Sequence, residues 1–351
     1  MNELSSHHTS SHPTSSYHTY NEIRSQPRAW QAALERASRA PLPQAGDYAQ
    51  TLFTGCGSTY YLSLAAAALY QSLTQRPARA IPGGELLLNP QTALTDQPTL
   101  LVAISRSGTT TETVKAVERF KAQGRGDVVA ITNYETELAQ LADAIILIPE
   151  GQESSVAQTR SFASMYVAAT VFGLRMAGEA NGLLDAMAAL PALGERLLQE
   201  YAPLARELGE NLDFDRFYFL GSGIRYGLAC EVNLKMKEMT LTHSEPFHFL
   251  EFRHGPMSMV NERAVVVGLV SEHNFGPEQA VLDEMRALGG TILSLGEGGT
   301  DVAFRSGVAE ILRGVLYLPV LQLMALYRSL AKGLDPDHPN NLSAVIQLSN
   351  L

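Results

Sequence analysis

The sequence is poor in cysteine and carries no excess of positive charge. Cys56 and Cys230 are the only cysteines among 351 residues, and no C-x-x-C pair is present. Two isolated thiols disfavour a disulfide framework and a zinc site, so we expect no metal and no other cofactor, and we predict a cytoplasmic location. The formal net charge is −10, which disfavours nucleic acid as a partner.

The sequence also lacks a clear secretory signal and a clear membrane-spanning segment. The first 20 residues have no basic region followed by an apolar one, and we interpret residues 1–20 as a polar, disordered tail. The longest apolar stretch, 311–327, is interrupted by Arg313 and Gln322. It falls short of the roughly 20 apolar residues that a spanning helix needs. We therefore predict a soluble protein without a membrane partner.

A repeat with an offset of 166 residues divides the chain into two similar halves. The G-x-G of 55–57 recurs at 221–223, and Ser105, which ends one apolar run, corresponds to Ser271, which ends another. Apolar runs alternate with helical patterns in both halves, which is typical of parallel sheets covered on both faces. We predict an α/β fold with two tandem doubly wound, flavodoxin-like parallel-sheet domains. Their expected ranges are 21–182 and 214–351, the latter with a C-terminal tail, and 183–213 is the expected connector.

Two loops of the first half have the composition of a phosphate site. One is SRSGTTTE (105–112), in which Thr109 and Glu112 form a capping-box pattern, and the other is GCGST (55–59). Hydroxyls and free N–H groups at a helix N-terminus bind anions, although Ser, Gly and Thr are also ordinary turn residues. Two such loops at one sheet edge favour a phosphomonoester as the ligand. NAD and ATP are disfavoured because neither nucleotide-binding fingerprint is present. The corresponding loop of the second half, 271–275, has an acid and an aromatic residue instead and is predicted to be unfit for phosphate.

Candidate acid and base residues lie in the second half. A predicted helix over 228–241 places Glu231, Lys235 and Glu238 on one stripe. A carboxylate beside a lysine suits a general base, but an exposed salt-bridged face has the same pattern. His254 precedes Gly-Pro, a position that suits either a positioned acid/base group or a structural turn.

These motifs together resemble a known family. The ordered set GCGSTYY, ISRSGTTTET, EGQESSVAQTRSF, EVNLKMKE and RHGP is similar to the tandem sugar isomerase (SIS) domains of glucosamine-6-phosphate synthase. It is also similar to stand-alone SIS amino-sugar phosphate isomerases and deaminases, which share the segment YNEIRSQPRAW. The resemblance extends from about residue 20 to the end of the chain.

The resemblance implies a site and an assembly. The phosphate would be held by Gly57, Ser58, Thr59, Ser105, Arg106, Ser107 and Thr110, and the sugar would be lined by Val156, Ala157 and Gln158. Glu238 would move a proton between C1 and C2, with Lys235 and Glu231 beside it. His254 would assist ring opening from the neighbouring subunit of a homodimer, so that the active site lies at the subunit interface.

Two departures from the synthase narrow the expected function. Residues 1–45 cannot form its glutaminase domain, and Asn341-Leu342 is followed by Ser343-Ala344 instead of a lysine. We predict an enzyme, an isomerase or deaminase of a hexosamine or ketosamine 6-phosphate, that works by metal-free proton transfer without glutamine hydrolysis. The alternatives are a fructosamine-6-phosphate deglycase and a non-catalytic phosphosugar-sensing protein.

Overall fold

The computed structural model describes residues 13–178 and 180–348. Most of the segment that we interpreted as a tail, 1–20, lies outside the described residues. Within the remainder, a short 3₁₀ helix, η1 (Thr14–Ser16), precedes helix α1, which begins at His18 and ends at Arg39. Helical structure is therefore present within the last part of the segment that we interpreted as a tail.

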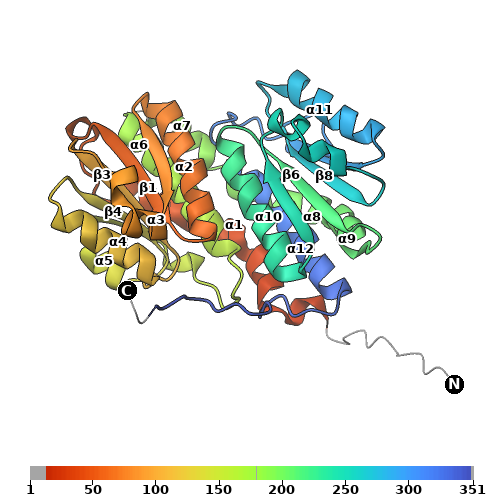
Figure 1. Cartoon of the computed structure of the whole chain (residues 1–351), viewed down its shortest axis with the longest axis horizontal. Helices are drawn as coiled ribbons and strands as arrows, with labels where there is room; N and C mark the ends of the chain where they lie inside the picture. The colour runs from red at the N-terminus through yellow and green to blue at the C-terminus, as the bar shows by residue number, and fades with distance from the viewer. Residues whose placement is uncertain (1–12, 179, 349–351) are drawn as a thin grey trace.

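Within these described residues, ten strands form two parallel five-stranded sheets, one in each half (Figure 1). The first sheet has the order β2-β1-β3-β4-β5, and the second has the corresponding order β7-β6-β8-β9-β10. The strands of the first sheet are β1 (Gln50–Gly55), β2 (Ala78–Pro82), β3 (Thr99–Ser105), β4 (Val128–Thr132) and β5 (Ala144–Leu147). Those of the second are β6 (Arg216–Leu220), β7 (His243–Phe247), β8 (Ala264–Leu269), β9 (Thr291–Gly296) and β10 (Val302–Ala303). This topology confirms the predicted pair of doubly wound α/β halves.

The central strands are continuous apolar runs because helices cover both of their faces. Every residue of β3, TLLVAIS, and of β8, AVVVGL, is buried. The helices of the first half are α2 (Ser58–Thr74), α3 (Gly83–Leu88), α4 (Thr111–Ala122), α5 (Glu137–Leu141) and α6 (Arg160–Ala177). Those of the second are α10 (Ile224–Thr240), α11 (Phe275–Ala287) and α12 (Leu318–Ala331). Helices α7 (Ala180–Met187), α8 (Leu190–Glu200) and α9 (Ala202–Glu210) lie between them in the chain.

The repeat is reproduced in the backbone. Helices α2 and α10 begin and end at residues that differ by 166, and the glycine before each, Gly57 or Gly223, has a φ of 58°. A positive φ is readily adopted only by glycine, which explains why both turns carry it. The sequence repeat is therefore a repeat of strand, turn and helix.

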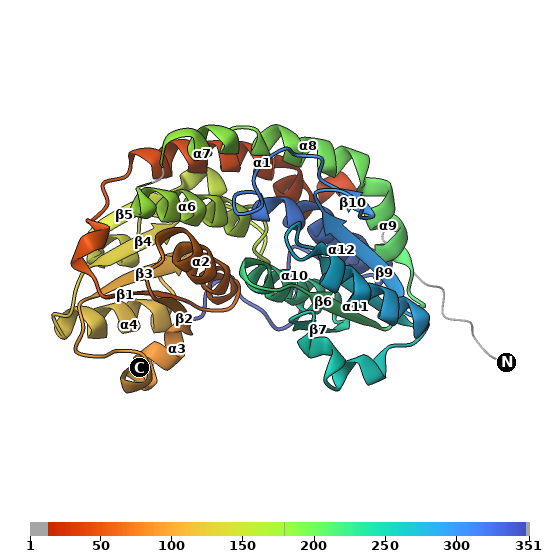
Figure 2. The same ribbon diagram turned by 90° about the horizontal axis from the view of Figure 1, so that it is seen from above.

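The two halves share one apolar core. The largest cluster of buried apolar side chains includes Leu62 and Ala65 of α2 together with Leu228 and Val232 of α10. Helices α2 and α10 lie side by side between the two sheets (Figure 2), and α1 packs on α6 and α8. Smaller clusters cover the outer face of each sheet. The halves consequently meet through helices, and their sheets remain separate.

One helical stretch, Gly314–Ala331, has the length and composition to cross a membrane, but 89% of it is buried inside the fold. It contains the 3₁₀ helix η7 (Gly314–Tyr317) and α12, and α12 packs on α9 and α10. Its apolar side chains therefore belong to the core.

Candidate active site

The two loops predicted to bind phosphate lie side by side at the carboxyl edge of the first sheet. They follow β1 and β3, which are adjacent parallel strands, and this is the point at which the strand order reverses. Cys56 Sγ of one loop lies 3.4 Å from Thr113 Oγ1 in the helix that follows the other. Ligands of doubly wound folds bind at this position because the loops there point in opposite directions and leave a crevice.

Several loop hydroxyls form local hydrogen bonds that shape the turns. Thr59 Oγ1 accepts from the Cys56 N–H and donates to the Cys56 carbonyl, both over 2.9 Å. Ser105 Oγ accepts from the Gly108 N–H over 3.1 Å. Ser107 Oγ accepts from the Thr109 N–H over 3.2 Å. These bonds hold the two loops in fixed conformations around the crevice.

The predicted capping box of Thr109 and Glu112 is wrong. Helix α4 begins at Thr111, and its N-cap residue, Thr110, makes no side-chain capping bond. The expected N-cap, Thr109, is one position before the observed one, because the helix is preceded by a run of similar small residues, Ser107 to Thr110. Within the described part of the chain, the N–H groups of Arg106 and Ser107 have no acceptor. They are available to an anion at the N-terminal end of α4.

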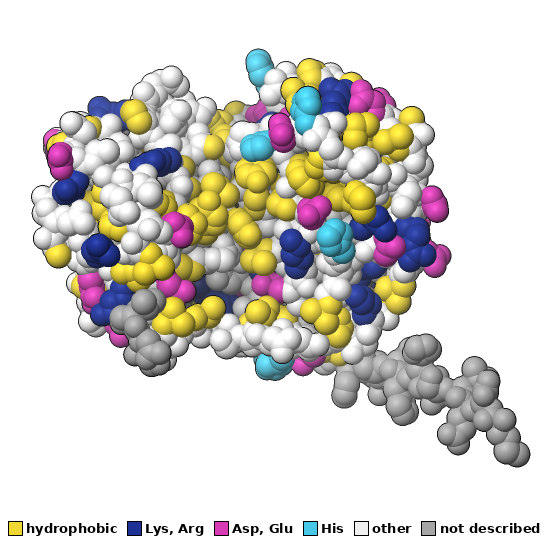
Figure 3. Space-filling model, viewed as in Figure 1, with side chains coloured by type: hydrophobic (Ala, Val, Ile, Leu, Met, Phe, Trp, Pro, Cys, Tyr) yellow, Lys and Arg dark blue, Asp and Glu magenta, His cyan; other side chains and the backbone are white. Residues whose placement is uncertain are grey.

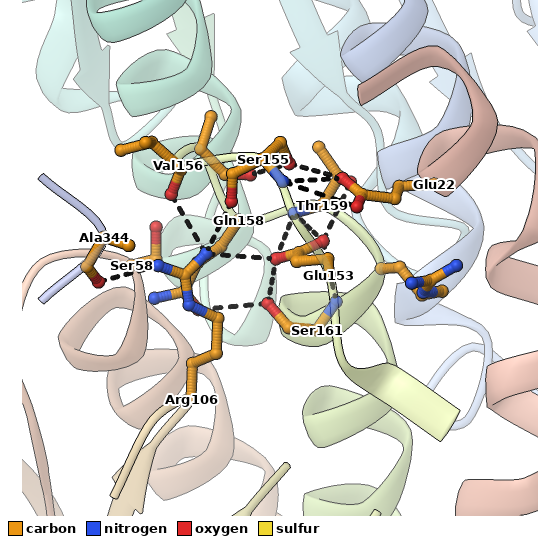
Figure 4. A network of polar contacts seen from close by, with 12 residues as sticks. Glu22, Ser58, Arg106, Glu153, Ser155, Val156, Gln158, Thr159, Ser161 and Ala344 are labelled. Atoms are coloured by element: carbon orange, nitrogen blue, oxygen red, sulfur yellow. Dashed lines mark hydrogen bonds and ion pairs between the residues drawn. The ribbon is translucent and has the colours of Figure 1, made fainter. Parts of the chain in front are cut away.

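Arg106 bridges three segments within the fold. Its guanidinium donates to the carbonyls of Ser155 (3.1 Å), Val156 (3.0 Å) and Ala344 (2.7 Å), and it lies 3.5 Å from the carboxylate of Glu153. The side chains of Arg106 and Glu153 are 7% and 0% exposed. Figure 4 shows Arg106 reaching from its loop to this group of carbonyls. Arg106 therefore ties the predicted sugar-lining segment and the C-terminal segment to the phosphate loop.

Two buried glutamates that sequence reasoning missed fix the conformation of the segment 153–161 (Figure 4). Glu153 accepts hydrogen bonds from the N–H and hydroxyl groups of Thr159 and Ser161. Glu22, on α1, accepts from the N–H groups of Ser154 and Ser155 and from the Ser155 hydroxyl. In the sequence, these two glutamates are marked only by their positions within the motifs YNEIRSQPRAW and EGQESSVAQTRSF.

The predicted sugar-lining residues lie on this fixed segment. Ala157 is buried, whereas Val156 and Gln158 are partly exposed. The Val156 N–H donates to the carbonyl of Asp337 over 3.0 Å, and the Asp337 carboxylate accepts from the N–H groups of His18 and Thr19 at the start of α1. Asp337 thereby connects the segment to α1 and to the C-terminal part of the chain.

The candidate acid and base residues of α10 form a buried cluster, not an exposed face. The side chains of Glu231, Lys235 and Glu238 are 0%, 1% and 13% exposed. Lys235 Nζ donates to Glu238, lies 3.3 Å from Glu231 Oε1, and donates to Ser58 Oγ of the first half over 3.2 Å. The close approach of α2 and α10 allows this contact, because a Cβ at Gly227 would lie 2.5 Å from backbone atoms of Tyr61 and Ala65.

Burial and charge set the protonation of this cluster. Burial raises the pKa of Glu231 to about 8, although Lys235 opposes the shift. Burial alone would lower the pKa of Lys235, but the charges of Glu231, Glu238 and Glu153 outweigh it and raise that pKa. At neutral pH the cluster therefore holds a protonated lysine beside a carboxylic acid that tends to keep its proton.

His254 is the predicted site residue that the structure leaves apart from this cluster. It is exposed, in a turn after the 3₁₀ helix η5 (Glu251–Arg253), and its ring has no hydrogen bond or ion pair among the described residues. The chain around His254 also contains β7 and the 3₁₀ helix η6 (Pro256–Met259). Over the described ranges, no group of three or more His, Cys, Asp or Glu side chains could hold a metal ion.

Comparisons with known proteins agree with this geometry. The family model described as SIS domain matches residues 48–175 and 213–312. The glutamine–fructose-6-phosphate aminotransferase of Pyrococcus horikoshii is 31% identical over 309 residues, which are 84% of this chain and 51% of that protein. Its counterpart in Thermococcus kodakarensis is 30% identical over 342 residues, 92% of this chain and 56% of that protein. The chain thus spans about half the length of the curated relatives it matches.

Solved structures match over nearly the whole chain. A glucosamine-6-phosphate deaminase from Thermotoga maritima has a TM-score of 0.81 at 25% identity and covers 94% of this chain and 99% of its own. A tagatose-6-phosphate ketose/aldose isomerase from Escherichia coli has a TM-score of 0.77 at 24% identity, with the same two coverages. Both structures contain the two-sheet architecture described above, and the matched proteins are named as enzymes.

Proposed function

Because this chain belongs to the SIS domain family, we propose that it is an enzyme that isomerises or deaminates a hexosamine or ketosamine 6-phosphate. The reaction would move a proton between C1 and C2 of the open-chain sugar. The names of the similar proteins, a glucosamine-6-phosphate deaminase and a tagatose-6-phosphate isomerase among them, support this substrate class. The two free cysteines fit a cytoplasmic enzyme.

One observation carries the proposal: the cluster of Glu231, Lys235 and Glu238 reaches Ser58, which belongs to one of the two predicted phosphate loops. A general base must lie within reach of the carbon that loses the proton, and the phosphate fixes where that carbon sits. In this fold the base comes from the second half and the phosphate loops come from the first. Their contact supports a single site for proton transfer and phosphate binding.

Glu238 is the residue that we assign as the base. It is the least buried member of the cluster, and its carboxylate accepts a hydrogen bond from Lys235 Nζ. Glu238 would take the proton from one carbon of an enediol or enolamine intermediate and return it to the next. Glu231, whose pKa burial raises to about 8, is the second carboxyl group beside Lys235.

The phosphate group would bind at the free N–H groups of Arg106 and Ser107, at the N-terminal end of α4. We assign Arg106 a positioning role, because its guanidinium already donates to three carbonyls. It donates to Ala344, in the segment where the resemblance led us to expect a lysine. The arginine would thus hold this segment against the site and keep Val156 and Gln158 facing the sugar.

We further propose a homodimer in which His254 of one chain completes the site of the other. His254 is exposed and unpaired within the described residues, as expected for a side chain whose partner lies on another chain. Apolar side chains gather on the surface along the boundary between the halves (Figure 3), where α2 and α10 approach each other. Partly exposed Tyr60 and Tyr226 belong to these helices, and the Tyr226 ring stacks on the exposed ring of His248.

A substrate panel with one pair of variants tests the proposal. Purified protein is assayed with hexose, hexosamine and fructosamine 6-phosphates for aldose–ketose exchange, ammonia release and amine release, which separates isomerase, deaminase and deglycase activities. Glu238→Gln should lower kcat by about 10²–10⁴-fold, the usual contribution of a general base, while sugar-phosphate binding stays near that of the wild type. Glu118→Gln is the matched control, because Glu118 forms the same i,i+3 pair with Lys115 on an exposed helix face.

Two outcomes would reject this function. Phosphosugar binding without turnover of any panel member would instead indicate a sensing protein. Turnover that is unchanged in Glu238→Gln would show that the base lies elsewhere.

A further inference from the structure

The second half repeats the geometry of the phosphate loop, although its sequence differs. In the first half the Gly108 N–H donates to Ser105 Oγ over 3.1 Å. The residues 166 positions later make the same bond, since the Asn274 N–H donates to Ser271 Oγ over 3.1 Å. Both loops follow the third strand of their half, and both precede a helix, α4 or α11. The second half therefore keeps the backbone of an anion-binding loop.

The two loops differ in what their N–H groups contact. The N–H groups of Glu272 and His273 both donate to Glu310 Oε2 over 3.1 Å, and Ser271 Oγ donates to Glu310 Oε1 over 2.7 Å. Their counterparts in the first half are the N–H groups of Arg106 and Ser107, which have no acceptor in the described part of the chain. A carboxylate of the chain itself is bound where the first half presents free donors.

A buried cation strengthens the second site. Arg225 stands 166 residues after Thr59 and donates to Glu310 Oε1. It also lies 3.3 Å from Glu278, and its side chain is only 10% exposed. Its Nε has no partner among the described residues. The second loop therefore faces a guanidinium where the first faces a hydroxyl.

We propose that the second half contains a second oxyanion site, for inorganic phosphate or a phosphate monoester, which the carboxylate of Glu310 occupies. The donors are those that bind phosphate in other proteins: two successive backbone N–H groups, a serine hydroxyl and a guanidinium. A carboxylate satisfies them with the same kind of oxygen atoms. Glu310 thus prevents substrate phosphate from binding at the second loop.

The charge state of Glu310 agrees with this role. Burial would raise the pKa of Glu310, but the Ser271 hydroxyl, the His273 N–H and the charge of Arg225 outweigh burial and lower it. The group is therefore an anion at neutral pH.

The first half contributes no residue that could serve as a base to the space above the second site. A cavity of about 400 Å³ is lined by Ser222, Arg225, Asn274 and Glu310 from the second half and by Ala68 and Ser72 of α2. Ser72 corresponds to Glu238, and Ala65 and Leu69 correspond to Glu231 and Lys235. A sugar phosphate at this place would meet His273 but no counterpart of the cluster of Glu231, Lys235 and Glu238. Occupation by Glu310 keeps phosphosugar from binding there unproductively.

Replacement of Glu310 tests the proposal. Glu310→Ala removes the carboxylate and leaves its four donors, whereas Glu310→Gln removes the charge but still fills the space. Calorimetric titration with inorganic phosphate should show one more binding site per chain in Glu310→Ala than in the wild type, and no additional site in Glu310→Gln. The melting temperature of Glu310→Ala should fall in chloride and recover saturably in phosphate at equal ionic strength.

The result does not depend on the proposed enzyme activity, because the readout is a difference in phosphate sites between variants. An equal number of sites in the wild type and Glu310→Ala would overturn the proposal. If Glu310→Ala folds in neither phosphate nor chloride while Glu310→Gln folds, the proposal is also wrong, since phosphate then fails to replace the carboxylate. If the protein's substrate proves not to be a phosphosugar, the proposed function is wrong, but the proposal of a second oxyanion site still stands.

Discussion

The ammonium group of Lys235, on α10, lies 3.2 Å from the hydroxyl of Ser58, at the start of α2. The two helices are related by the repeat and come from different halves of the chain. Neither half alone therefore contains both the predicted phosphate loops and the candidate acid/base cluster. The tandem arrangement places the loops that follow β1 and β3, in the first half, beside helix α10 of the second half.

The pH dependence of stability should report on Glu231. Its pKa in the folded protein is raised to about 8 from 4.5, so the fold binds this proton more tightly than the unfolded chain does. The stabilisation is complete below pH 4.5 and is lost as the pH rises towards 8, with a slope of at most about 1.4 kcal/mol per pH unit. Glu231→Gln cannot titrate and should lack this loss.

Urea unfolding at a series of pH values between 5 and 9 measures the effect. The free energy of unfolding of the wild type should fall relative to that of Glu231→Gln up to about pH 8 and run parallel above it. Parallel curves throughout would mean that Glu231 is ionised in the folded protein. Glu118→Gln, which changes an exposed carboxylate, should follow the wild type.

The contact of the two helices should not tolerate a side chain at Gly227. A Cβ there would lie 2.5 Å from the Tyr61 carbonyl oxygen and the Ala65 nitrogen, both backbone atoms that cannot rotate away. Gly227→Ala should lower the free energy of unfolding by about 1–3 kcal/mol, the usual cost of overpacking. It should also reduce turnover, because α10 carries Lys235 and Glu238. Gly84→Ala, at a helical position with nothing within 4 Å, should unfold like the wild type.

The repeat allowed the fold to be predicted because it is a local pattern. Strand, glycine turn and helix follow one another within about 25 residues in each half, so their order can be read without knowledge of tertiary contacts. The stripe of Glu231, Lys235 and Glu238 was also predicted, but its burial was not. Burial depends on the approach of α2, which is 166 residues away in the chain.

The contacts that the sequence did not identify are long-range. Glu22 binds a segment 132 residues further along the chain, Arg106 binds a carbonyl 238 residues away, and Glu310 binds a loop 38 residues before it. No local spacing signals such partners. The start of α4 was misplaced for a different reason, since consecutive threonines offer several equivalent N-cap positions.

Arg106 should prove to be a positioning residue. Arg106→Lys keeps the charge, but its single nitrogen cannot replace the two guanidinium nitrogens that reach carbonyls of different segments, and it leaves the fully buried carboxylate of Glu153 poorly paired. Weakening a buried pair of this kind costs up to about 3–5 kcal/mol. We expect faster amide exchange in residues 153–158 and 343–348 and a KM raised more than kcat is lowered. Arg119→Lys, an exposed arginine that donates to one carbonyl, should change neither. A direct phosphate contact would instead leave amide exchange unaltered.

Mixing two inactive variants should restore activity if His254 acts across a dimer interface. Glu238→Gln loses the base and His254→Asn loses the exposed imidazole, so each homodimer has two defective sites. In a heterodimer, one site combines both substitutions and the other combines neither, because a two-fold interface is built twice from the same surfaces. Random exchange of subunits should therefore recover about a quarter of the wild-type activity. Exchange is promoted by mild denaturant and monitored by native mass spectrometry with one variant isotopically labelled. Heterodimers without regained activity would place Glu238 and His254 in the same chain's site, or His254 outside the reaction.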